Sequence, residues 1–178
     1  NRTGRIYWAD RDTRTIYSAA ENGTGVQRLL ASGLGLVESL AVDWIGQNLY
    51  WADYVLQHIE VSRLDGRRRR ILFNENVTNP RGLVLDPRAQ ARYLFWTDWG
   101  RFPRIERADL DGSRRTAIVT TKLYYPNGLA VDLHRQRQLR GVVFDPRDVA
   151  QRHADGRAAS LLALVLEQRI VGRDRGHR

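Results

Sequence analysis

Cysteine is absent from this chain of 178 residues, so the chain can form neither disulfides nor thiolate metal sites. Methionine is absent too, and no apolar run reaches the ~18 residues that a membrane-spanning helix needs. We find no secretory signal at the N-terminus. These absences predict an internal piece of a longer protein, whose membrane attachment, if any, belongs to other parts.

The sequence does contain an internal repeat. An aromatic-Trp-x-Asp segment starts 43 and then 45 residues apart, at Tyr7, Tyr50 and Phe95. Two further markers keep the same phase, a Leu-x-x-Asp segment and a hairpin glycine, at Leu40, Leu83 and Leu129 and at Gly23, Gly66 and Gly112. A period of roughly 40 to 50 residues with four strand-like segments is typical of a β-propeller blade.

The predicted fold is therefore all-β, a partial propeller of about three blades with four antiparallel strands each. We assign residues 1–137 to the propeller fragment. The blades are expected at 1–36 (partial, its last three strands only), 37–79 and 80–125, with the start of a fourth at 126–137. The pattern then fails, since Leu139 stands where the next aromatic strand is due. Residues 138–178 are expected to form a divergent tail that is disordered or holds one helix at 158–171.

The recurring residues are predicted to be structural. Within each aromatic strand the Trp and Asp share one face and the Tyr or Phe takes the other, because side chains alternate along a strand. We interpret the Asp as a hydrogen-bond acceptor at a blade junction rather than a metal ligand or acid–base group, because a group repeated in every blade serves packing. The set comprises Tyr7, Trp8, Asp10, Asp43, Tyr50, Trp51, Asp53, Asp86, Phe95, Trp96, Asp98 and Asp132.

The sequence predicts no catalytic residue, metal ligand or cofactor within the chain, and we do not expect an enzyme. It has no nucleophile elbow, phosphate loop or His-rich metal spacing. The rival is a hydrolase on a six-bladed propeller, which would need inward-facing polar residues that differ from blade to blade. The positions that align instead repeat.

The net charge of +9 favours acidic partners. Arg67–Arg70 and Arg114–Arg115 suggest a polyanion binder, for example of heparan sulfate, but a solvated hairpin is the favoured interpretation. No nucleic-acid motif is present. Three N-x-Ser/Thr sequons mark glycosylation candidates at Asn1, Asn22 and Asn76. Candidate ligand contacts lie in one loop that combines aromatic and basic side chains, at Trp99, Arg101, Phe102 and Arg104. The alternative is that Trp99 and Phe102 pack against the neighbouring blade.

The Tyr-Trp-x-Asp strand, the preceding Leu-x-x-Asp strand and the Ile-Glu-x-x-x-Leu-Asp-Gly hairpin resemble the class B, or YWTD, repeats of the low-density lipoprotein receptor family. The run from Asn79 to Ala108 is most similar to megalin-type receptor-related proteins. The resemblance implies a six-bladed parent in the extracellular part of a single-pass endocytic receptor, with calcium held by neighbouring modules. It also implies protein or lipoprotein ligands that are released in acidic endosomes. His58, expected to be exposed and the only His in a complete blade, is the candidate pH sensor.

Overall fold

The computed structural model describes residues 4–88, 92–132, 138–144, 164–165 and 168–169. Every regular element among them is a β-strand, which confirms the predicted all-β class. None of the described residues forms a helix long and apolar enough to span a bilayer. The strands are β1 Arg5–Asp10, β2 Thr15–Ala20, β3 Gln27–Leu30, β4 Val37–Asp43, β5 Asn48–Asp53, β6 His58–Arg63, β7 Arg70–Phe73, β8 Pro80–Asp86, β9 Tyr93–Asp98, β10 Arg104–Asp109, β11 Thr116–Val119, β12 Tyr125–Asp132, β13 Gln138–Phe144, β14 Leu164–Val165 and β15 Gln168–Arg169.

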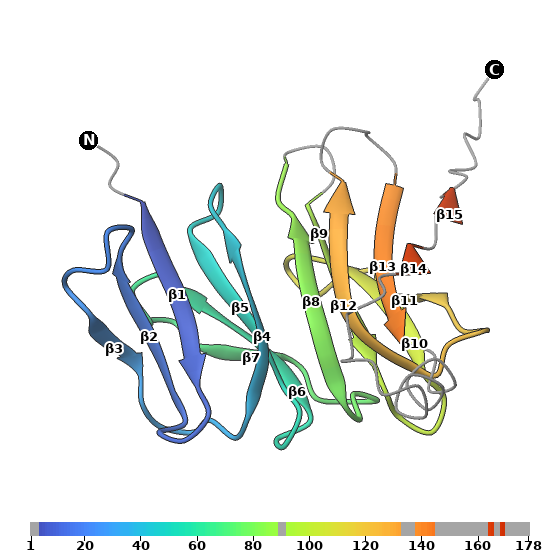
Figure 1. Cartoon of the computed structure of the whole chain (residues 1–178), viewed down its shortest axis with the longest axis horizontal. Coiled ribbons are helices and arrows are strands. Elements are labelled where there is room, and N and C mark those ends of the chain that lie inside the picture. The colour runs from blue at the N-terminus through green and yellow to red at the C-terminus, as the bar shows by residue number, and fades with distance from the viewer. Residues whose placement is uncertain (1–3, 89–91, 133–137, 145–163, 166–167, 170–178) are drawn as a thin grey trace, which may run out of the picture.

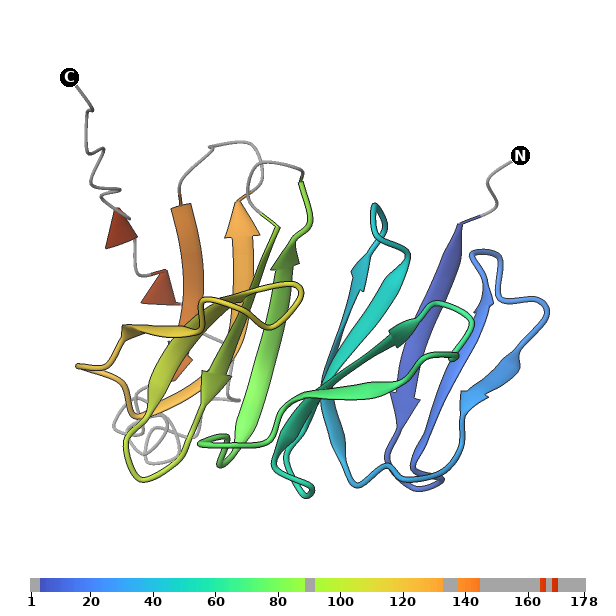
Figure 2. The same ribbon diagram turned by 180° about the vertical axis from the view of Figure 1, so that it is seen from behind.

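The strands form four antiparallel sheets that lie side by side from one end of the molecule to the other (Figure 1). The same succession is seen from behind in Figure 2. The first sheet has three strands, β1-β2-β3, as predicted for a blade whose first strand is not in the chain. The second and third sheets are complete meanders, β4-β5-β6-β7 and β8-β9-β10-β11. This arrangement is a partial β-propeller.

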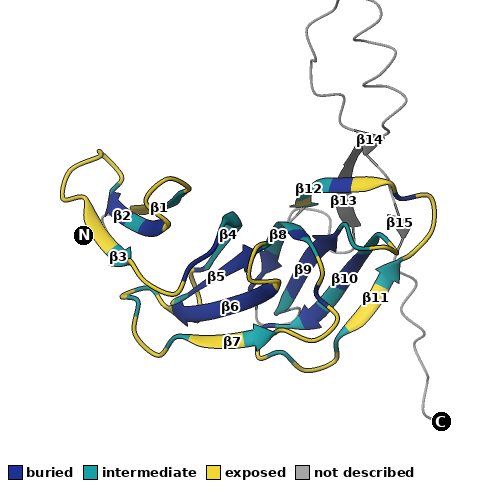
Figure 3. Cartoon of the chain, turned by 90° about the horizontal axis from the view of Figure 1, so that it is seen from below, coloured by how far each residue is buried: buried dark blue, intermediate teal, exposed yellow. Residues whose placement is uncertain are grey.

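The sheets form a curved row in the view from below (Figure 3). Strands β4, β8 and β12 lie along its inner side, and β3, β7 and β11 form its outer edge. Middle strands are the most buried: β5 reads as almost continuously buried, whereas the outer β7 begins with two exposed residues. A strand with a sheet packed on each face has no solvent side, so its sequence carries apolar residues at successive positions rather than at alternate ones.

The aromatic pair of each middle strand divides between two apolar cores. Trp51 packs toward the first sheet with Leu49 and Ile16, whereas Tyr50 packs toward the third sheet. One blade later Trp96 joins the core shared with the second sheet, and Phe95 belongs to the next core. Each fully buried Trp removes about 200 Å² from water, which contributes about 5 kcal/mol of gross hydrophobic stabilisation. The motif therefore joins each blade to both of its neighbours.

The hairpin glycines are required by their backbone conformation. Gly23, Gly66 and Gly112 have φ values of 81°, 79° and 95°, in the left-handed region that glycine enters without strain. At Gly66 a Cβ atom would also lie 2.9 Å from the carbonyl oxygen of Leu29 in the preceding blade. The glycines therefore fix the shape of all three turns, and the turns at Gly66 and Gly112 are also packed closely against the neighbouring sheet, whereas a Cβ at Gly23 would meet open space.

The expectation for residues 138–178 needs correction in two places. Strand β13 pairs antiparallel with β12 from Tyr125↔Phe144 to Asp132↔Gln138, so the fourth blade continues past residue 137 without its aromatic motif. Backbone pairing needs no particular side chain, and Leu139, Val142 and Val143 supply enough β-forming character. The helix expected at 158–171 is wrong where the structure describes it, because β14 and β15 pair with β13. The rest of that span, like Asn1 and the side chain of Asp132, lies outside the described residues.

Candidate ligand-binding rim

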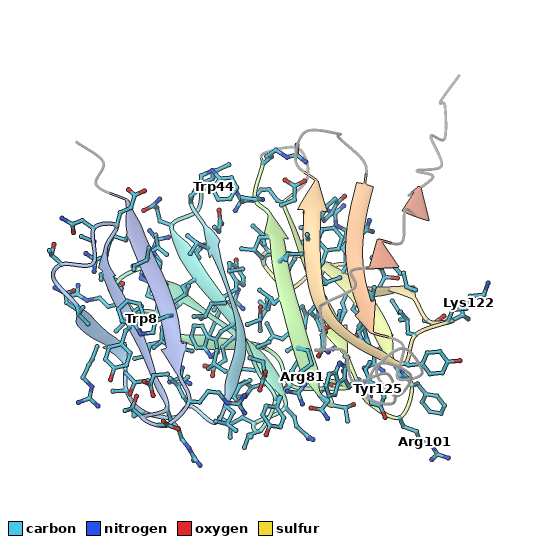
Figure 4. The ribbon with its side chains drawn as sticks, in the orientation of Figure 1. Trp8, Trp44, Arg81, Arg101, Lys122 and Tyr125 are labelled. Carbon is cyan, nitrogen blue, oxygen red and sulfur yellow. The ribbon has the colours of Figure 1, made fainter. Side chains whose placement is uncertain are left out.

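The inner strands β4, β8 and β12 start at the same end of the molecule, the lower edge in Figure 4. There Arg81 Nη1 lies 3.0 Å from Glu38 Oε1, which joins the second and third sheets. The Arg81 guanidinium also lies over two aromatic rings, 4.3 Å from the Tyr54 centroid and 4.1 Å from that of Trp99. Trp99 in turn contacts Tyr125 edge-to-face at 5.3 Å. We call these five residues the Arg81 rim, a continuous polar and aromatic array across three blades.

The Arg81 rim occupies positions that differ from blade to blade. Two residues before the repeated Leu stand Glu38, Arg81 and Asn127, which carry three different chemistries at one place in the fold. This position lies outside the repeated motifs, so a comparison of those motifs does not reveal it. The signal was available by counting back from Leu40, Leu83 and Leu129. A recognition surface requires residues that differ between blades at a position where the surrounding motif repeats. A residue that served packing alone would be the same in each blade.

Two of the four candidate ligand contacts are integrated into the fold. Trp99 donates from Nε1 to the carbonyl oxygen of Pro126 at 2.9 Å and is only partly exposed. Arg104 pairs with Glu106 at 2.7 Å and with Asp98 at 3.2 Å, and it donates to the carbonyl oxygen of Asn76. The packing interpretation therefore holds for Trp99, and Arg104 stabilises the loop rather than presenting a free charge.

The other two candidates remain available to a partner. Phe102 is 72% exposed, the highest fraction among the exposed large apolar side chains, and the Arg101 guanidinium lies 5.6 Å from its ring. The alternative that Phe102 packs against the neighbouring blade does not hold among the described residues. Tyr124 and Tyr125 add two half-exposed rings at the same edge, where Figure 4 labels Arg101 and Tyr125. Arg101, Phe102 and Tyr124 extend the Arg81 rim at this edge, and the accessible part of the extended rim is aromatic with a basic border.

The motif aspartates fasten the linkers between blades. Asp53 is fully buried, and its carboxylate accepts hydrogen bonds from the amides of Gly35 and Leu36 in the incoming linker and of Val55 and Leu56 in its own turn, at 2.6 to 3.1 Å. Asp98 repeats this pattern with the amides of Thr78, Asn79 and Gly100. Asp10 accepts from the amide and hydroxyl of Thr13 in its own turn, and these hydrogen bonds lower the pKa of Asp10. The role of acceptor at a blade junction is therefore seen in the structure.

The Leu-x-x-Asp carboxylates are held in a similar way. Asp43 is fully buried, accepts from the amides of Ile45 and Gly46 at 3.1 and 2.7 Å, and lies 3.3 Å from Arg92 Nη2. Asp86 pairs with Arg88. Within the described part of the chain, no group of three or more His, Asp or Glu side chains is placed to hold a metal ion. Each of these carboxylates already has a hydrogen-bond donor or a cation beside it.

A buried ion pair recurs in blades two and three. Arg69 binds Glu60 through two nitrogens at 2.6 and 2.7 Å and lies over Trp51, and Arg115 binds Glu106 in the same way over Trp96. Burial alone would raise the pKa of Glu60, but hydrogen bonds from Arg69 and His58 lower it to about 2. Two arginines of the runs noted in the sequence are thus structural, not solvated.

His58 is not the exposed residue that the sequence predicted. It is 8% exposed, and its Nε2 lies 2.7 Å from Glu60 Oε1. Its counterpart one blade later is Arg104, which contacts Glu106 in the same place. Because a side chain in contact with the buried glutamate fills this position in both blades, His58 belongs to the buried cluster around Glu60 and not to the accessible rim.

The sequons at Asn22 and Asn76 lie in exposed turns. Asn22 Oδ1 accepts from the amide and hydroxyl of Thr24 at 3.1 and 2.7 Å, and Asn76 is exposed with a φ of 51°. Neither side chain is covered by another blade, so the described structure leaves room for a glycan at both.

Comparison with known proteins reveals relatives for most of the described residues. Residues 47–87 and 92–133 match the family model described as low-density lipoprotein receptor repeat class B. The chain is 44% identical over 102 residues to low-density lipoprotein receptor-related protein 5 of Mus musculus, and 37% identical over 106 residues to a human protein named low-density lipoprotein receptor-related protein 5-like. The matched parts are 56% and 60% of this chain but 6% and 41% of those proteins, so the chain spans a minor part of either relative.

Solved structures show the same architecture. One chain of the crystal structure of a nidogen/laminin complex is 36% identical, with a TM-score of 0.75 over 80% of this chain and 53% of that one. A gluconolactonase of Xanthomonas campestris shares the fold at 19% identity, with a TM-score of 0.63 over 80% of this chain and 52% of that one. The second likeness is one of fold alone. None of these matches tests the narrower likeness to megalin-type receptors, which stays a prediction.

Proposed function

The chain carries low-density lipoprotein receptor class B repeats at residues 47–87 and 92–133, and on this basis we propose that it is an extracellular ligand-binding module of a receptor-related protein of that family. Its relatives by sequence are receptor-related proteins, and its neighbour in the solved structures is a chain from a complex with laminin. We place the binding surface on the accessible part of the Arg81 rim, and the partner is a protein or a lipoprotein.

The exposure of Phe102 carries this proposal. A large apolar ring that is 72% exposed beside Arg101 combines two residue types that dominate binding energy at protein interfaces. The loop that holds it is anchored at both ends, since Trp99 donates to Pro126 and Arg104 pairs with Asp98. A side chain presented by an anchored loop loses little conformational freedom on binding, which favours affinity.

The module binds without catalysis, and the chain needs no cofactor for this role. Support comes from the carboxylate of the rim, Glu38, which lies 3.0 Å from Arg81 and 3.6 Å from Arg11. The varied position that a hydrolase would need is thus occupied by an ion pair.

We further propose uptake of ligand into endosomes, with release there independent of His58. Glu60 has a pKa of about 2, so it remains ionised throughout endosomal acidification. His58 is 8% exposed and its Nε2 lies 2.7 Å from the Glu60 carboxylate, so the ring is engaged inside the blade and is not presented to a ligand. Release in acid must then act through the ligand or through other parts of the receptor.

The test uses cells that display the intact receptor containing this chain, probed with fluorescent laminin and with lipoprotein particles. We expect Phe102→Ser and Arg101→Glu each to lower binding at least tenfold for the probe that binds, with unchanged surface expression. The control is Arg28→Glu on the outer strand β3, which makes the same charge change away from the rim and should leave binding intact. Equal binding by all variants would move the site elsewhere, and no binding of either probe would remove the support for a protein or lipoprotein partner.

A further inference from the structure

A pocket opens between the second and third sheets at the opposite ends of the strands, close to the hairpin turns. It has a volume of about 500 Å³ and a partly apolar wall formed by Tyr50, Val61 and Leu110. Five arginines and two aspartates line it, and the arginines are Arg63, Arg68, Arg70, Arg92 and Arg114. Strand β5 runs from this pocket at Asn48 to the Arg81 rim beyond Asp53, so the two places are separated by a strand length. A ligand held in this pocket would thus be independent of the proposed function at the rim.

Three of the pocket arginines, Arg68, Arg70 and Arg92, have no basic counterpart one blade earlier, although Arg114 repeats the position of Arg68 one blade later. At the equivalent positions between the first and second sheets stand Gly25, Gln27 and Gln47, where the pocket has Arg68, Arg70 and Arg92. Both junctions form the same kind of sheet-to-sheet contact, so packing does not require these cations. Three uncharged residues replaced by three arginines at one junction indicate a role specific to that junction.

Several of these charges are not compensated by a carboxylate. Arg63 Nη1 donates to the carbonyl oxygen of Gly46 at 2.9 Å, and Arg70 Nη2 reaches the carbonyl oxygen of Asp111 at 3.4 Å. Within the described part of the chain the Arg68 guanidinium has no hydrogen-bond or ion-pair partner, and its side chain is exposed. Arg92 and Arg114 instead pair with Asp43 and Asp109. Five arginines of the lining thus face three carboxylates, those of Asp109 and Asp111 in the lining and that of Asp43 beside Arg92, so the pocket has an excess of positive charge.

Successive side chains of the hairpin point in different directions, so the four arginines at 67–70 have different surroundings. Arg69 turns to the buried Glu60, whereas Arg68 and Arg70 line the pocket. Arg67 lies outside the lining, is 86% exposed and is 3.9 Å from Asp65. The run is thus a structural cation flanked by two pocket cations, with one solvated member.

We propose that this pocket binds a sulfated oligosaccharide. The planar guanidinium forms paired hydrogen bonds to oxyanions. Three guanidinium groups around a pocket of about 500 Å³ require a ligand that carries several anionic groups within the width of a disaccharide. A sulfated disaccharide meets that density. An acidic peptide is the weaker fit, because same-face carboxylates on an extended chain stand roughly 7 Å apart, one for every two residues.

Binding is measured on the full chain with a size-defined heparin tetrasaccharide, and circular dichroism checks that each variant is folded. Arg68→Asn with Arg70→Gln should weaken binding at least tenfold and flatten its dependence on salt; Asn tolerates the left-handed backbone of residue 68, whose φ is 53°. Arg67→Gln is the matched control, because it removes the same charge from the same turn outside the pocket, and its effect should stay below twofold. As a second readout without any substitution, the tetrasaccharide should protect Arg68 and Arg70, but not Arg67, from modification by phenylglyoxal.

Three results would overturn the proposal. Equal weakening by Arg67→Gln and Arg70→Gln would show a diffuse charge effect with no pocket. Absence of binding and of protection in the folded wild-type chain would show no site for this ligand. Tighter binding of an oligoglutamate peptide than of the tetrasaccharide would assign the pocket to acidic peptides.

Discussion

Replacing Arg69 by Met should strongly destabilise the chain, although Arg69 lies in a hairpin at the surface. The side chain keeps Glu60 ionised in a site where that carboxylate is 3% exposed, and it covers the face of Trp51. Met retains the length and much of the apolar stem but removes every donor. The carboxylate would then be left with His58 alone.

The size of the loss can be worked out from the pKa of Glu60. The value falls from 4.5 to about 2 in the folded chain, and a difference of this size corresponds to about 3 kcal/mol. This value agrees with the general cost of removing one partner of a buried ion pair, which is about 3 to 5 kcal/mol. The lost bonds to the carbonyl oxygens of Ser32 and Gly33 add less, since water can reach those exposed residues. We therefore expect a loss of about 3 kcal/mol near neutral pH.

Urea denaturation followed by tryptophan fluorescence measures this loss. Arg68→Met is the matched control, since the same substitution one residue earlier removes an unpaired exposed cation and should change stability by less than about 0.5 kcal/mol. The folded-state pKa of Glu60 lies below its unfolded value, so its contribution is present above about pH 4.5 and is lost as the pH falls toward 2. The difference between wild type and Arg69→Met should shrink across that window. A loss under about 1 kcal/mol at pH 7, or a difference that does not change with pH, would refute this account.

Four further outcomes can be checked. Asp53→Ala should cost more than about 3 kcal/mol by leaving four amides without their acceptor, and Asp10→Ala about 1 kcal/mol, both measured by thermal melting; similar losses would contradict the linker role. His58→Gln should leave ligand dissociation at endosomal pH unchanged in the intact receptor, and a faster or slower dissociation would restore His58 as a pH sensor. The isolated chain should be marginally stable or self-associating, because no sheet of the described residues covers the outer face of the first sheet, and sizing should show this; a compact monomer that melts as high as a six-bladed propeller would contradict it. Secreted material should lose mass on glycosidase treatment at Asn22 and Asn76, and Asn→Gln changes should abolish the shift.

The sequence predicted the fold well because the repeat places every marker where packing needs it. Trp51 and Tyr50 face different cores, as strand alternation requires, and Gly66 occupies the left-handed turn that its spacing indicated. The motif did not predict β13, because a strand can join the edge of a sheet through backbone hydrogen bonds alone, without any of the motif residues. A search for motifs finds only strands that carry the motif.

The candidate site was less predictable, for a physical reason. The candidate loop holds two aromatic and two basic side chains, at Trp99, Arg101, Phe102 and Arg104. The sequence does not tell which of them are buried, yet in the structure Arg104 pairs with Asp98 and Phe102 is exposed. The difference depends on partners that are distant along the chain, such as Pro126 for Trp99. Likewise nothing local distinguishes Arg69 from Arg68. Only the position of Glu60 on the neighbouring strand determines which arginine is buried in an ion pair.

The carboxylates of Asp53 and Asp98 bear on how such a protein can evolve. Each one binds both the segment arriving from the previous blade and the turn of its own blade, so a repeat brings with it the means of attaching itself to whatever precedes it. A gene segment encoding one period could therefore be duplicated, lost or exchanged between receptors without new residues being selected at the joint. Exposed positions such as Arg101 and Phe102 would then be free to diverge, because the joint does not depend on them. Transplanting one blade between relatives should thus transfer its recognition chemistry with little loss of assembly.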